Sequence, residues 1–162
     1  MRIVGRCWVF GDNIDTDVIL PTQYLLLPDV KSMSKHAFEP LRPNFSNEVK
    51  KGDIIVAGRN FGCGSSREQA PAVLKELGVA AIVAKSFARI FYRNAINLGL
   101  PVVECSTLYD EIGEGDIVEI DLENGKILNK RTGRIHEATK IPEFIMEIFR
   151  CGGLVEYMRR DS

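Results

Sequence analysis

The feature that most constrains the fold is the stretch from residue 53 to residue 105, where short apolar runs alternate with runs of helical spacing. The apolar runs are "DIIVAGRN", "VAAIVAKS" and "LPVVEC", and between them stand "SREQAPAVLKELG" and "FARIFYRNAINLG". This β-α-β-α-β order predicts parallel strands joined by right-handed crossovers. Gly78 and Gly99 are expected to end the two helices, because glycine commonly follows the last helical turn. We therefore expect an α/β fold built around a parallel sheet.

The N-terminal quarter predicts one strand and little other regular structure. Residues 2–10, "RIVGRCWVF", alternate loosely and predict a first strand. The next segment, "GDNIDTDVILPTQYLLLPD", is rich in Asp, Asn and Pro and predicts a long irregular loop. A short helix is expected in "DVKSMSKHAFEPLRPNF", where Pro40 and Pro43 would end it.

The segment after Thr107 predicts antiparallel and helical additions to this core. "DIVEIDLENGKILN" consists of two alternating runs around Asn124-Gly125, a strong signal for a hairpin. "IPEFIMEIFRCGGLVEYMRR" predicts helix from Pro142 onward with a break at the glycine pair 152–153. The whole predicts a three-layer β/β/α arrangement, with a parallel core sheet and an added antiparallel hairpin.

Composition restricts the class of protein. With 162 residues, 45% hydrophobic and 27% charged, the chain fits a single globular domain over residues 1–162. The formal net charge of -1 gives no electrostatic case for binding nucleic acid or an anionic membrane. No apolar run approaches the roughly 20 residues that a membrane-spanning helix needs. No secretory signal is recognisable at the start, so we expect a cytoplasmic location.

The cysteines predict no metal site held by this chain. They are widely spaced and form no CxxC pair, and they are Cys7, Cys63, Cys105 and Cys151. Only His36 and His136, both expected at the surface, could assist them, so neither zinc nor an iron–sulfur cluster is expected here. Cys7 and Cys105 stand in apolar runs and predict buried thiols, whereas glycines flank Cys63 and predict partial access.

The segment "FGCGSSREQA", residues 61–70, lies between a predicted strand and a predicted helix, where parallel α/β sheets bind ligands. Gly62 and Gly64 allow a sharp turn and close approach to a ligand. Arg67 is suited to a carboxylate or phosphate. Either serine of the pair 65–66 could instead cap the helix that follows, and spacing leaves a ligand site and a helix cap both open. Pro71 indicates that the regular helix begins at or after Arg67. The segment fits neither a P-loop nor a GxSxG elbow.

Three segments resemble one protein family. "GSSREQA" resembles the GSSRE signature of the swivelling domain of the aconitase superfamily. "GDNIDTDVILPTQYL" is similar to the opening loop of 3-isopropylmalate dehydratase small subunits, and "FARIFYRNAINLGLPVV" resembles a helix of the same subunits. The matches occur in the family's order and cover nearly the whole chain. The resemblance implies a cytoplasmic hydro-lyase of leucine biosynthesis that interconverts 2-isopropylmalate and 3-isopropylmalate by dehydration and rehydration.

The resemblance also implies a divided active site. A large subunit would carry the [4Fe-4S] cluster, and this chain, inactive alone, would bind no metal. Ser65 would be the base that removes a proton from carbon. Ser66 and Arg67 would hold a substrate carboxylate, and Asp17 would orient a histidine of the partner.

By the same resemblance, the residues after Tyr24 face the variable group of the substrate. Homoaconitase-like relatives have an arginine at the position of Leu26, where an apolar side chain fits an isopropyl group. An apolar residue at this position favours isopropylmalate over homocitrate as the substrate and leaves citramalate open. The alternative interpretation is that Leu26 belongs to the core.

Other residues are expected to support the site. Gly64 shapes the turn and Tyr24 precedes the specificity position. Arg89 and Arg93 share one helix face and either brace the catalytic loop, meet the partner chain or are solvated. A non-catalytic binding or regulatory module of the same fold is the alternative from another functional class.

Overall fold

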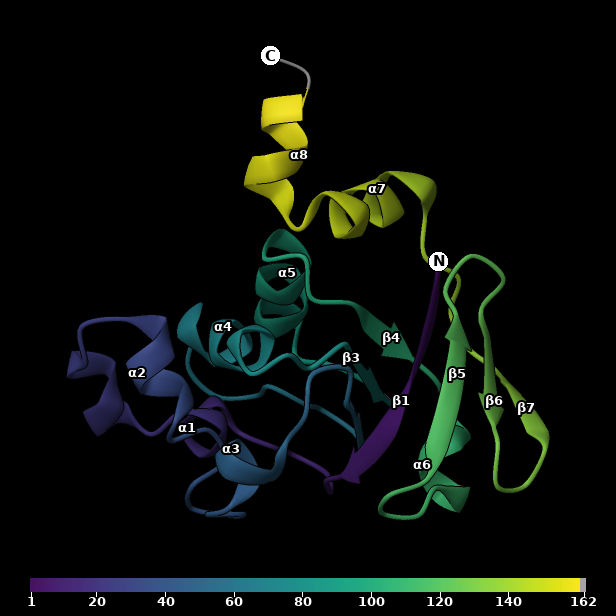
Figure 1. The fold of residues 1–162 in the computed structure, drawn as a ribbon, viewed down its shortest axis with the longest axis horizontal. Coiled ribbons are helices and arrows are strands. Elements are labelled where there is room, and N and C mark those ends of the chain that lie inside the picture. Colours follow the sequence, from purple (N-terminus) through teal and green to yellow (C-terminus); the bar gives the residue numbers. More distant parts are fainter. Residues whose placement is uncertain (161–162) are drawn as a thin grey trace.

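The structure is a computed structural model in which residues 1–160 are described. Its centre is a seven-stranded sheet with the order β4-β3-β2-β1-β5-β6-β7 (Figure 1). The strands are β1 (Arg2–Val9), β2 (Ile54–Ala57), β3 (Ala81–Ala84), β4 (Val102–Glu104), β5 (Ile117–Asp121), β6 (Lys126–Asn129) and β7 (Arg134–Glu137). The sheet is parallel from β1 to β4 and antiparallel from β1 to β7.

Helices cover the parallel half and the loops that follow it (Figure 1). The order α4, β3, α5, β4 confirms the predicted crossovers. The helical segments are α1 (Thr16–Ile19), η1 (Thr22–Leu26), α2 (Val30–Ser34), α3 (Phe45–Glu48), α4 (Gln69–Glu76), α5 (Arg89–Asn97), α6 (Leu108–Glu111), α7 (Glu143–Cys151) and α8 (Leu154–Arg160). In residues 1–160, none of these helices has the length and apolarity to cross a membrane.

Alternation along the central strands produces two apolar cores. In β2, Ile55 joins the core beneath α4 and α5, whereas Ile54 and Val56 join the core between the two halves of the sheet. Both faces of β2 and β3 are buried, which explains their continuous apolar runs. Met146 and Phe149 of α7 complete the second core. Helices, parallel strands and antiparallel strands form three layers, so the predicted β/β/α class is confirmed.

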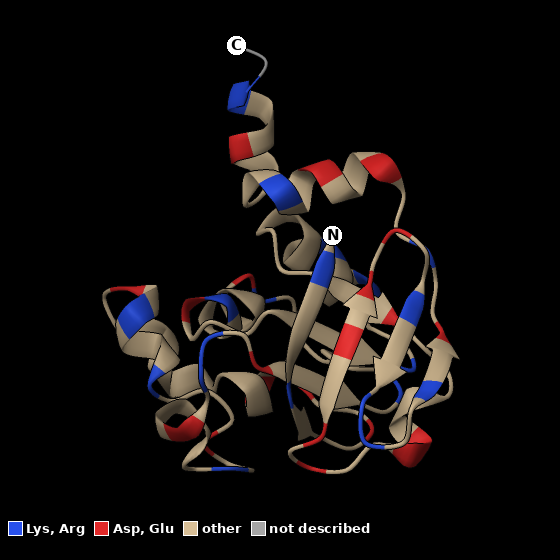
Figure 2. Ribbon diagram, turned by 45° about the vertical axis from the view of Figure 1, so that its right-hand side comes forward, with Lys and Arg blue, Asp and Glu red and all other residues tan. Residues whose placement is uncertain are grey.

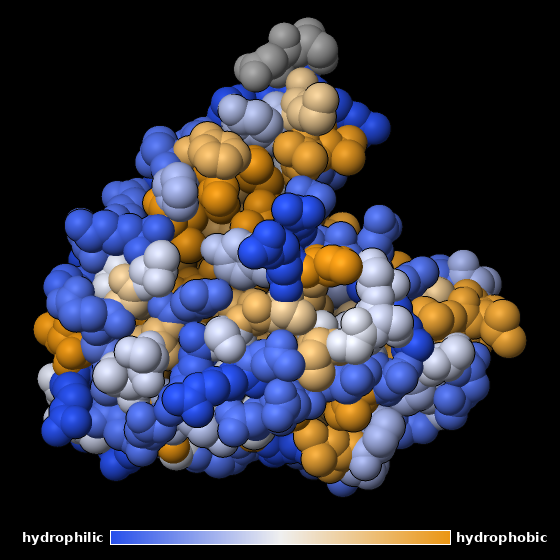
Figure 3. Space-filling view, turned by 180° about the vertical axis from the view of Figure 1, so that it is seen from behind, coloured by the Kyte–Doolittle hydropathy of each residue, from blue (hydrophilic) through white to orange (hydrophobic). Residues whose placement is uncertain are grey.

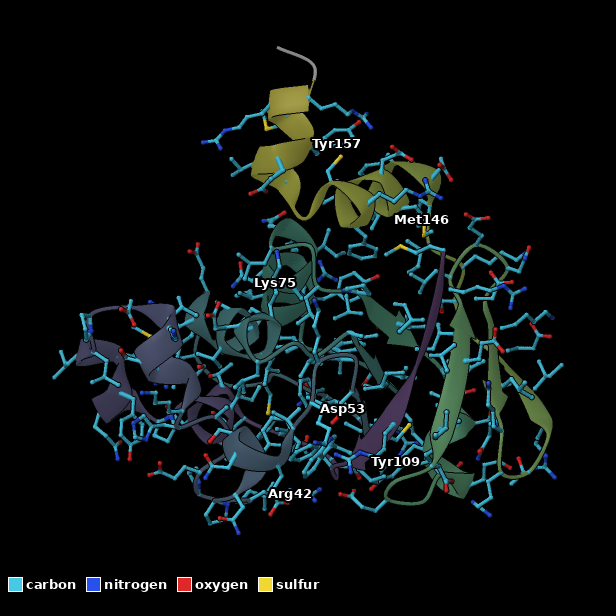
Figure 4. The ribbon with its side chains drawn as sticks, viewed as in Figure 1. Arg42, Asp53, Lys75, Tyr109, Met146 and Tyr157 are labelled. Atoms are coloured by element: carbon cyan, nitrogen blue, oxygen red, sulfur yellow. The ribbon has the colours of Figure 1, made fainter. Side chains whose placement is uncertain are left out.

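A buried carboxylate joins β1 to the start of β2. Asp53 accepts hydrogen bonds from Trp8 Nε1 at 2.8 Å, from the Lys50 backbone N–H at 2.8 Å and from Arg6 Nη2 at 3.2 Å (Figure 4). Burial alone raises the pKa of this carboxyl group, but the hydrogen bonds and the Arg6 charge outweigh burial and lower the pKa. Asp53 is therefore held ionised at neutral pH.

A lysine adds hydrogen bonds to the packing that attaches the helical pair α7–α8 to the body. Lys75 of α4 donates to the carbonyl oxygens of Leu98, just after α5, and of Gly152, just after α7, the latter at 2.7 Å (Figure 4). Carbonyl groups at the ends of helices lack partners within the helix, so one ammonium group satisfies two of them. Gly152, with φ of 89°, separates α7 from α8 as the glycine pair predicted.

The antiparallel half differs from the predicted hairpin by one strand. β5 and β6 form the expected hairpin, and β7 extends it as an edge strand. His136 of β7, expected at the surface, is buried between Glu111 Oε1, 2.7 Å from Nε2, and Thr107 Oγ1, 2.6 Å from Nδ1. That expectation was wrong because two polar partners satisfy the imidazole.

The outer face of the antiparallel half carries charged side chains beside exposed apolar ones, of which Val4 is 50% and Ile117 45% exposed. Arg2, Asp121, Lys126 and Glu137 stand side by side across β1, β5, β6 and β7, so that positive and negative charges alternate (Figure 2). Such surface pairs contribute little to stability. Ile135 of β7 is 61% exposed on this outer half of the molecule.

Candidate functional site

The candidate site lies where the loops after β1, β2 and β3 meet. The loop after β2 contacts the loop after β1 through Gly62 N–H to Ile14 O, at 2.7 Å, and through Thr16 N–H to Cys63 O, at 2.8 Å. Phe61 forms an isolated bridge with Phe87, which follows β3. The meeting point is the carboxyl edge of the parallel strands, the usual location of ligand sites in such sheets.

Glycine is required at two positions of the turn. Gly64 has φ of 97°, and a Cβ atom there would lie 2.5 Å from both carboxylate oxygens of Asp15. Gly62 has φ of 83°, and a Cβ atom there would lie 2.3 Å from the Phe91 ring. Other residues rarely adopt this backbone conformation, and neither neighbour leaves space for a side chain. The glycines therefore bring the turn close to both adjoining segments.

The two serines of this turn present their hydroxyl groups to solvent. Ser65 and Ser66 are exposed, and neither hydroxyl has a hydrogen-bond partner in residues 1–160. The capping interpretation was wrong, because α4 begins at Gln69 and Glu68, at its N-cap, makes no side-chain cap bond. The start of α4 after Arg67 is confirmed. The Ser65 carbonyl oxygen accepts a 2.9 Å hydrogen bond from Thr16 Oγ1, which fixes the backbone and leaves the hydroxyl available.

Arg67 fastens the serine turn to the segment that follows β1. Its guanidinium donates to Leu20 O at 2.8 Å and to Thr22 Oγ1 at 2.9 Å, and it forms an ion pair with Asp17. Thr22 Oγ1 in turn donates to Asp17 Oδ1 at 3.2 Å. Asp17 lies in the first turn of α1, and its backbone N–H donates to the carboxylate of Asp15, the N-cap residue, at 2.8 Å. The structure thus brings Asp17 and Arg67 together, as an ion pair that the sequence did not indicate.

A pocket of about 200 Å³ opens beside the serines. Its walls include Ser65, Ser66 and Arg67 on one side and Ala88, Arg89 and Ile90 on the other. The N-terminus of α5 carries no side-chain cap. The first N–H groups of a helix have no partner within it, so this wall carries a positive potential.

The two arginines of α5 differ in their position relative to this pocket. Arg89 lines the pocket, whereas Arg93, named from the sequence as a supporting residue, lies one turn further along α5 and does not line it. The signal that could have selected Arg89 is its place at the first helical position after a strand end.

The segment carrying the specificity position is a short helical turn rather than the irregular loop expected. In η1, the Tyr24 ring stacks on His36 with centroids 3.7 Å apart, and its hydroxyl donates to the Glu39 carboxylate. This hydrogen bond raises the pKa of Tyr24. Leu26 is 92% exposed, so the interpretation of this residue as core is wrong. Leu25 and Leu27, by contrast, pack against the core beneath α4.

Residues 1–160 do not form a metal or cluster site. In the described part of the chain, no three His, Cys, Asp or Glu side chains gather in a way that could hold a metal ion. Burial raises the pKa of Cys7 to about 12 and also raises the pKa of Cys63, which lies beside Asp15. Thiols that resist ionisation are poor metal ligands, because the thiolate is the form that binds.

Comparison with known proteins places this geometry in a family. The aconitase C-terminal domain family matches residues 29–107. The chain is 52% identical to the 3-isopropylmalate dehydratase small subunit of Thermodesulfovibrio yellowstonii, over 99% of this chain and 95% of that protein. It is 54% identical to 3-isopropylmalate dehydratase small subunit 1 of Archaeoglobus fulgidus, over 96% of each. The chain belongs to the 3-isopropylmalate dehydratase small-subunit family.

Membership in this family confirms the expectation of a hydro-lyase subunit related to aconitase. A crystal structure of a 3-isopropylmalate dehydratase from Methanocaldococcus jannaschii matches with a TM-score of 0.93 and 47% identity, over 99% of this chain and 95% of that one. A relative from the same organism, 50% identical over 98% of this chain and 94% of its own length, is named as an isopropylmalate/citramalate isomerase small subunit. The shared designation "small subunit" implies a large-subunit partner.

Proposed function

We propose that this chain supplies the base and the specificity turn for the interconversion of 2-isopropylmalate and 3-isopropylmalate, as a step of leucine biosynthesis. The partner is a large subunit that carries a [4Fe-4S] cluster. The observation that carries the proposal is the Ser65 hydroxyl, which is exposed on a glycine-defined turn and has no hydrogen-bond partner in residues 1–160, in a chain of this family.

Ser65 is the group that accepts a proton from the substrate carbon. An ordinary alcohol is too weakly acidic to be ionised at neutral pH, so a serine base needs a positive potential around its oxygen. The N-terminus of α5 and the charge of Arg89 face the same pocket and supply such a potential. Exclusion of water by the partner would strengthen both effects.

Ser66 and Arg67 hold a carboxylate of the substrate at the mouth of the pocket. Arg67 is held at three oxygen atoms of the loop after β1, so little freedom is lost when it binds an anion. Asp17 shares this guanidinium in the free chain and turns toward a histidine of the partner in the assembled enzyme. Arg67 therefore both orders the loop and recognises the substrate.

The cluster is assigned to the partner on the relation of this family to aconitase. Such a cluster supplies a Lewis acid for the departing hydroxyl group. The division of roles accounts for a pocket that is open in this chain, and it predicts that the chain alone is inactive.

Leu26 selects the substituent of the substrate. Its exposed apolar side chain offers a surface for an isopropyl group and no charge for the additional carboxylate of homocitrate. Citramalate, whose substituent is a methyl group, is the second candidate substrate, and the name of the Methanocaldococcus jannaschii relative favours it. The net charge of -1 gives no support to an RNA-binding module.

The test is Ser65→Ala in the complex reconstituted with the large subunit. We expect a loss of about 10²–10⁴-fold in kcat, the range attributed to a positioned acid–base group. Exchange of the substrate's carbon-bound proton with D₂O should fall in parallel. Ser106→Ala is the matched control, because Ser106 is also exposed and its hydroxyl has no partner in residues 1–160. Unchanged turnover by Ser65→Ala would exclude the serine base and favour a non-catalytic role.

A further inference from the structure

The exposed face of α5 forms a continuous strip between the pocket and the C-terminal helix. Ile90, Asn94 and Asn97 are spaced i, i+4 and i+7 and therefore lie along one line of the helix surface. Ile90 lines the serine pocket, whereas Asn94 and Asn97 line a second pocket bounded by Leu154 and Val155 of α8. We call the surface from Ile90 to α8 the α5–α8 strip.

The α8 end of the strip is an apolar helix face that residues 1–160 leave exposed. Leu154, Val155 and Met158 share one face of α8, and no residue of this helix is buried in the chain. Val155 is 56% exposed and Met158 is 65% exposed. In Figure 1, α8 projects from the body, and Figure 3 shows apolar surface on this projecting part. Side chains of this kind gathered on a protruding helix mark a surface that another protein covers.

The middle of the strip carries two arginines of α5, and Glu68 lines the second pocket beside them. Arg89 and Arg93 are exposed on α5, and neither has an acidic partner in residues 1–160. Lys75, in contrast, is used within the fold to hold α5 and α7 together. A partner that fits the strip therefore combines an apolar contact at α8 with acidic groups opposite α5.

We propose that the occupant of the α5–α8 strip is the large subunit of the enzyme, an inference that rests on the proposed function. The chain that completes the serine pocket must lie against its rim, where Ile90 stands. A stable interface covers about 800 Å² per partner, which corresponds to a disc of about 16 Å radius. α5 has nine residues and is about 13 Å long, at about 1.5 Å per residue. An interface of ordinary size centred on the pocket therefore reaches α8.

The test compares two exposed apolar residues by titration of the small subunit into the purified large subunit. Val155→Asp places a charge in the proposed interface, and Ile135→Asp places one on the outer face of the antiparallel half at similar exposure. We expect Val155→Asp to raise Kd by at least about tenfold, as at a well-packed interface position, and Ile135→Asp to leave Kd unchanged. Arg93→Glu should weaken binding in the same way, whereas Lys130→Glu, an exposed cation outside the strip, should not.

Each outcome separates the strip from the catalytic proposal. Activity of the Val155→Asp complex should return at saturating large subunit, because the change affects association and leaves the base intact. Equal Kd values for Val155→Asp and the wild type would overturn the proposal. So would a small-subunit dimer that Val155→Asp dissociates, because the occupant would then be a second copy of this chain. If Ser65→Ala binds normally and stays active, the proposed serine base fails while the interface stands.

Discussion

The exposure of Leu26 leads to a quantitative prediction about substrate choice. Burial of a leucine side chain is worth about 1.5–3 kcal/mol, and nearly the whole side chain is available because it is 92% exposed in the free chain. Leu26→Ala keeps one of its four side-chain carbons. We therefore expect kcat/KM for isopropylmalate to fall about 10- to 100-fold, the equivalent of about 1.4–2.7 kcal/mol. The smaller methyl group of citramalate makes fewer contacts, so its kcat/KM should fall less.

The assay measures kcat/KM for both substrates with the reconstituted enzyme, together with the Tm of each free small subunit. Leu41→Ala is the control, because Leu41 is also an exposed leucine but does not lie in the specificity turn. The Tm of both variants should equal that of the wild type, since neither side chain is in the core. If Leu26→Ala leaves the ratio of the two kcat/KM values unchanged, the specificity role of this position is refuted.

Two further substitutions test the scaffold. Gly64→Ala should lower kcat/KM at least about 100-fold, because the added Cβ displaces the Asp15 carboxylate and misplaces the turn. Gly115→Ala is the control, because Gly115 has φ of 85° and no atom lies within 4 Å of the added Cβ. It therefore shares only the backbone strain, about 1 kcal/mol. Equal losses of kcat/KM in both variants would contradict the argument. Asp53→Asn should reduce the free energy of unfolding by about 2–3 kcal/mol at pH 7. Because folding lowers the pKa of Asp53, this stabilisation is complete above about pH 4 and is lost as the pH falls through the folded pKa. Urea unfolding should therefore show a smaller difference in the free energy of unfolding between the wild type and Asp53→Asn at pH 2.5 than at pH 7. A difference that stays constant would rule out this linkage.

The parallel half of the fold could be predicted because its pattern is redundant. β2 and β3 are apolar at every position. Gly78 follows α4, which joins β2 to β3, and Gly99 follows α5, which joins β3 to β4; their φ values are 89° and 79°. Several local signals thus indicate the same structure.

No comparable set of local sequence signals indicates β7. It is four residues long, and His136 is its only buried residue. Its inward position depends on Glu111 and Thr107, which lie 25 and 29 residues away in the sequence. Contacts over that separation leave no local periodicity, so the strand and the burial of its histidine could not be predicted.

The candidate site shows the same division. The serine turn could be located because glycines and serines stand between a strand and a helix. The ion pair of Arg67 with Asp17 joins two loops that are 50 residues apart in the sequence, and no spacing rule connects them. Arg89 and Arg93 share one face of α5, so helical spacing alone does not separate them, and the position of Arg89 at the start of α5 places it at the pocket.

The contacts of Arg67 imply that the positions of the base and of the specificity turn are coupled. Arg67 follows the serine pair directly, and it holds Leu20 O and Thr22 Oγ1 at the start of η1, the turn that carries Leu26. A displacement of η1 therefore acts on the serine turn through one rigid guanidinium. Because both segments present their functional side chains to solvent, the free chain gains no stability from those side chains. The order of the site must then come from the buried residues behind it, which explains why Gly62 and Thr16 are buried while Ser65 and Leu26 are exposed.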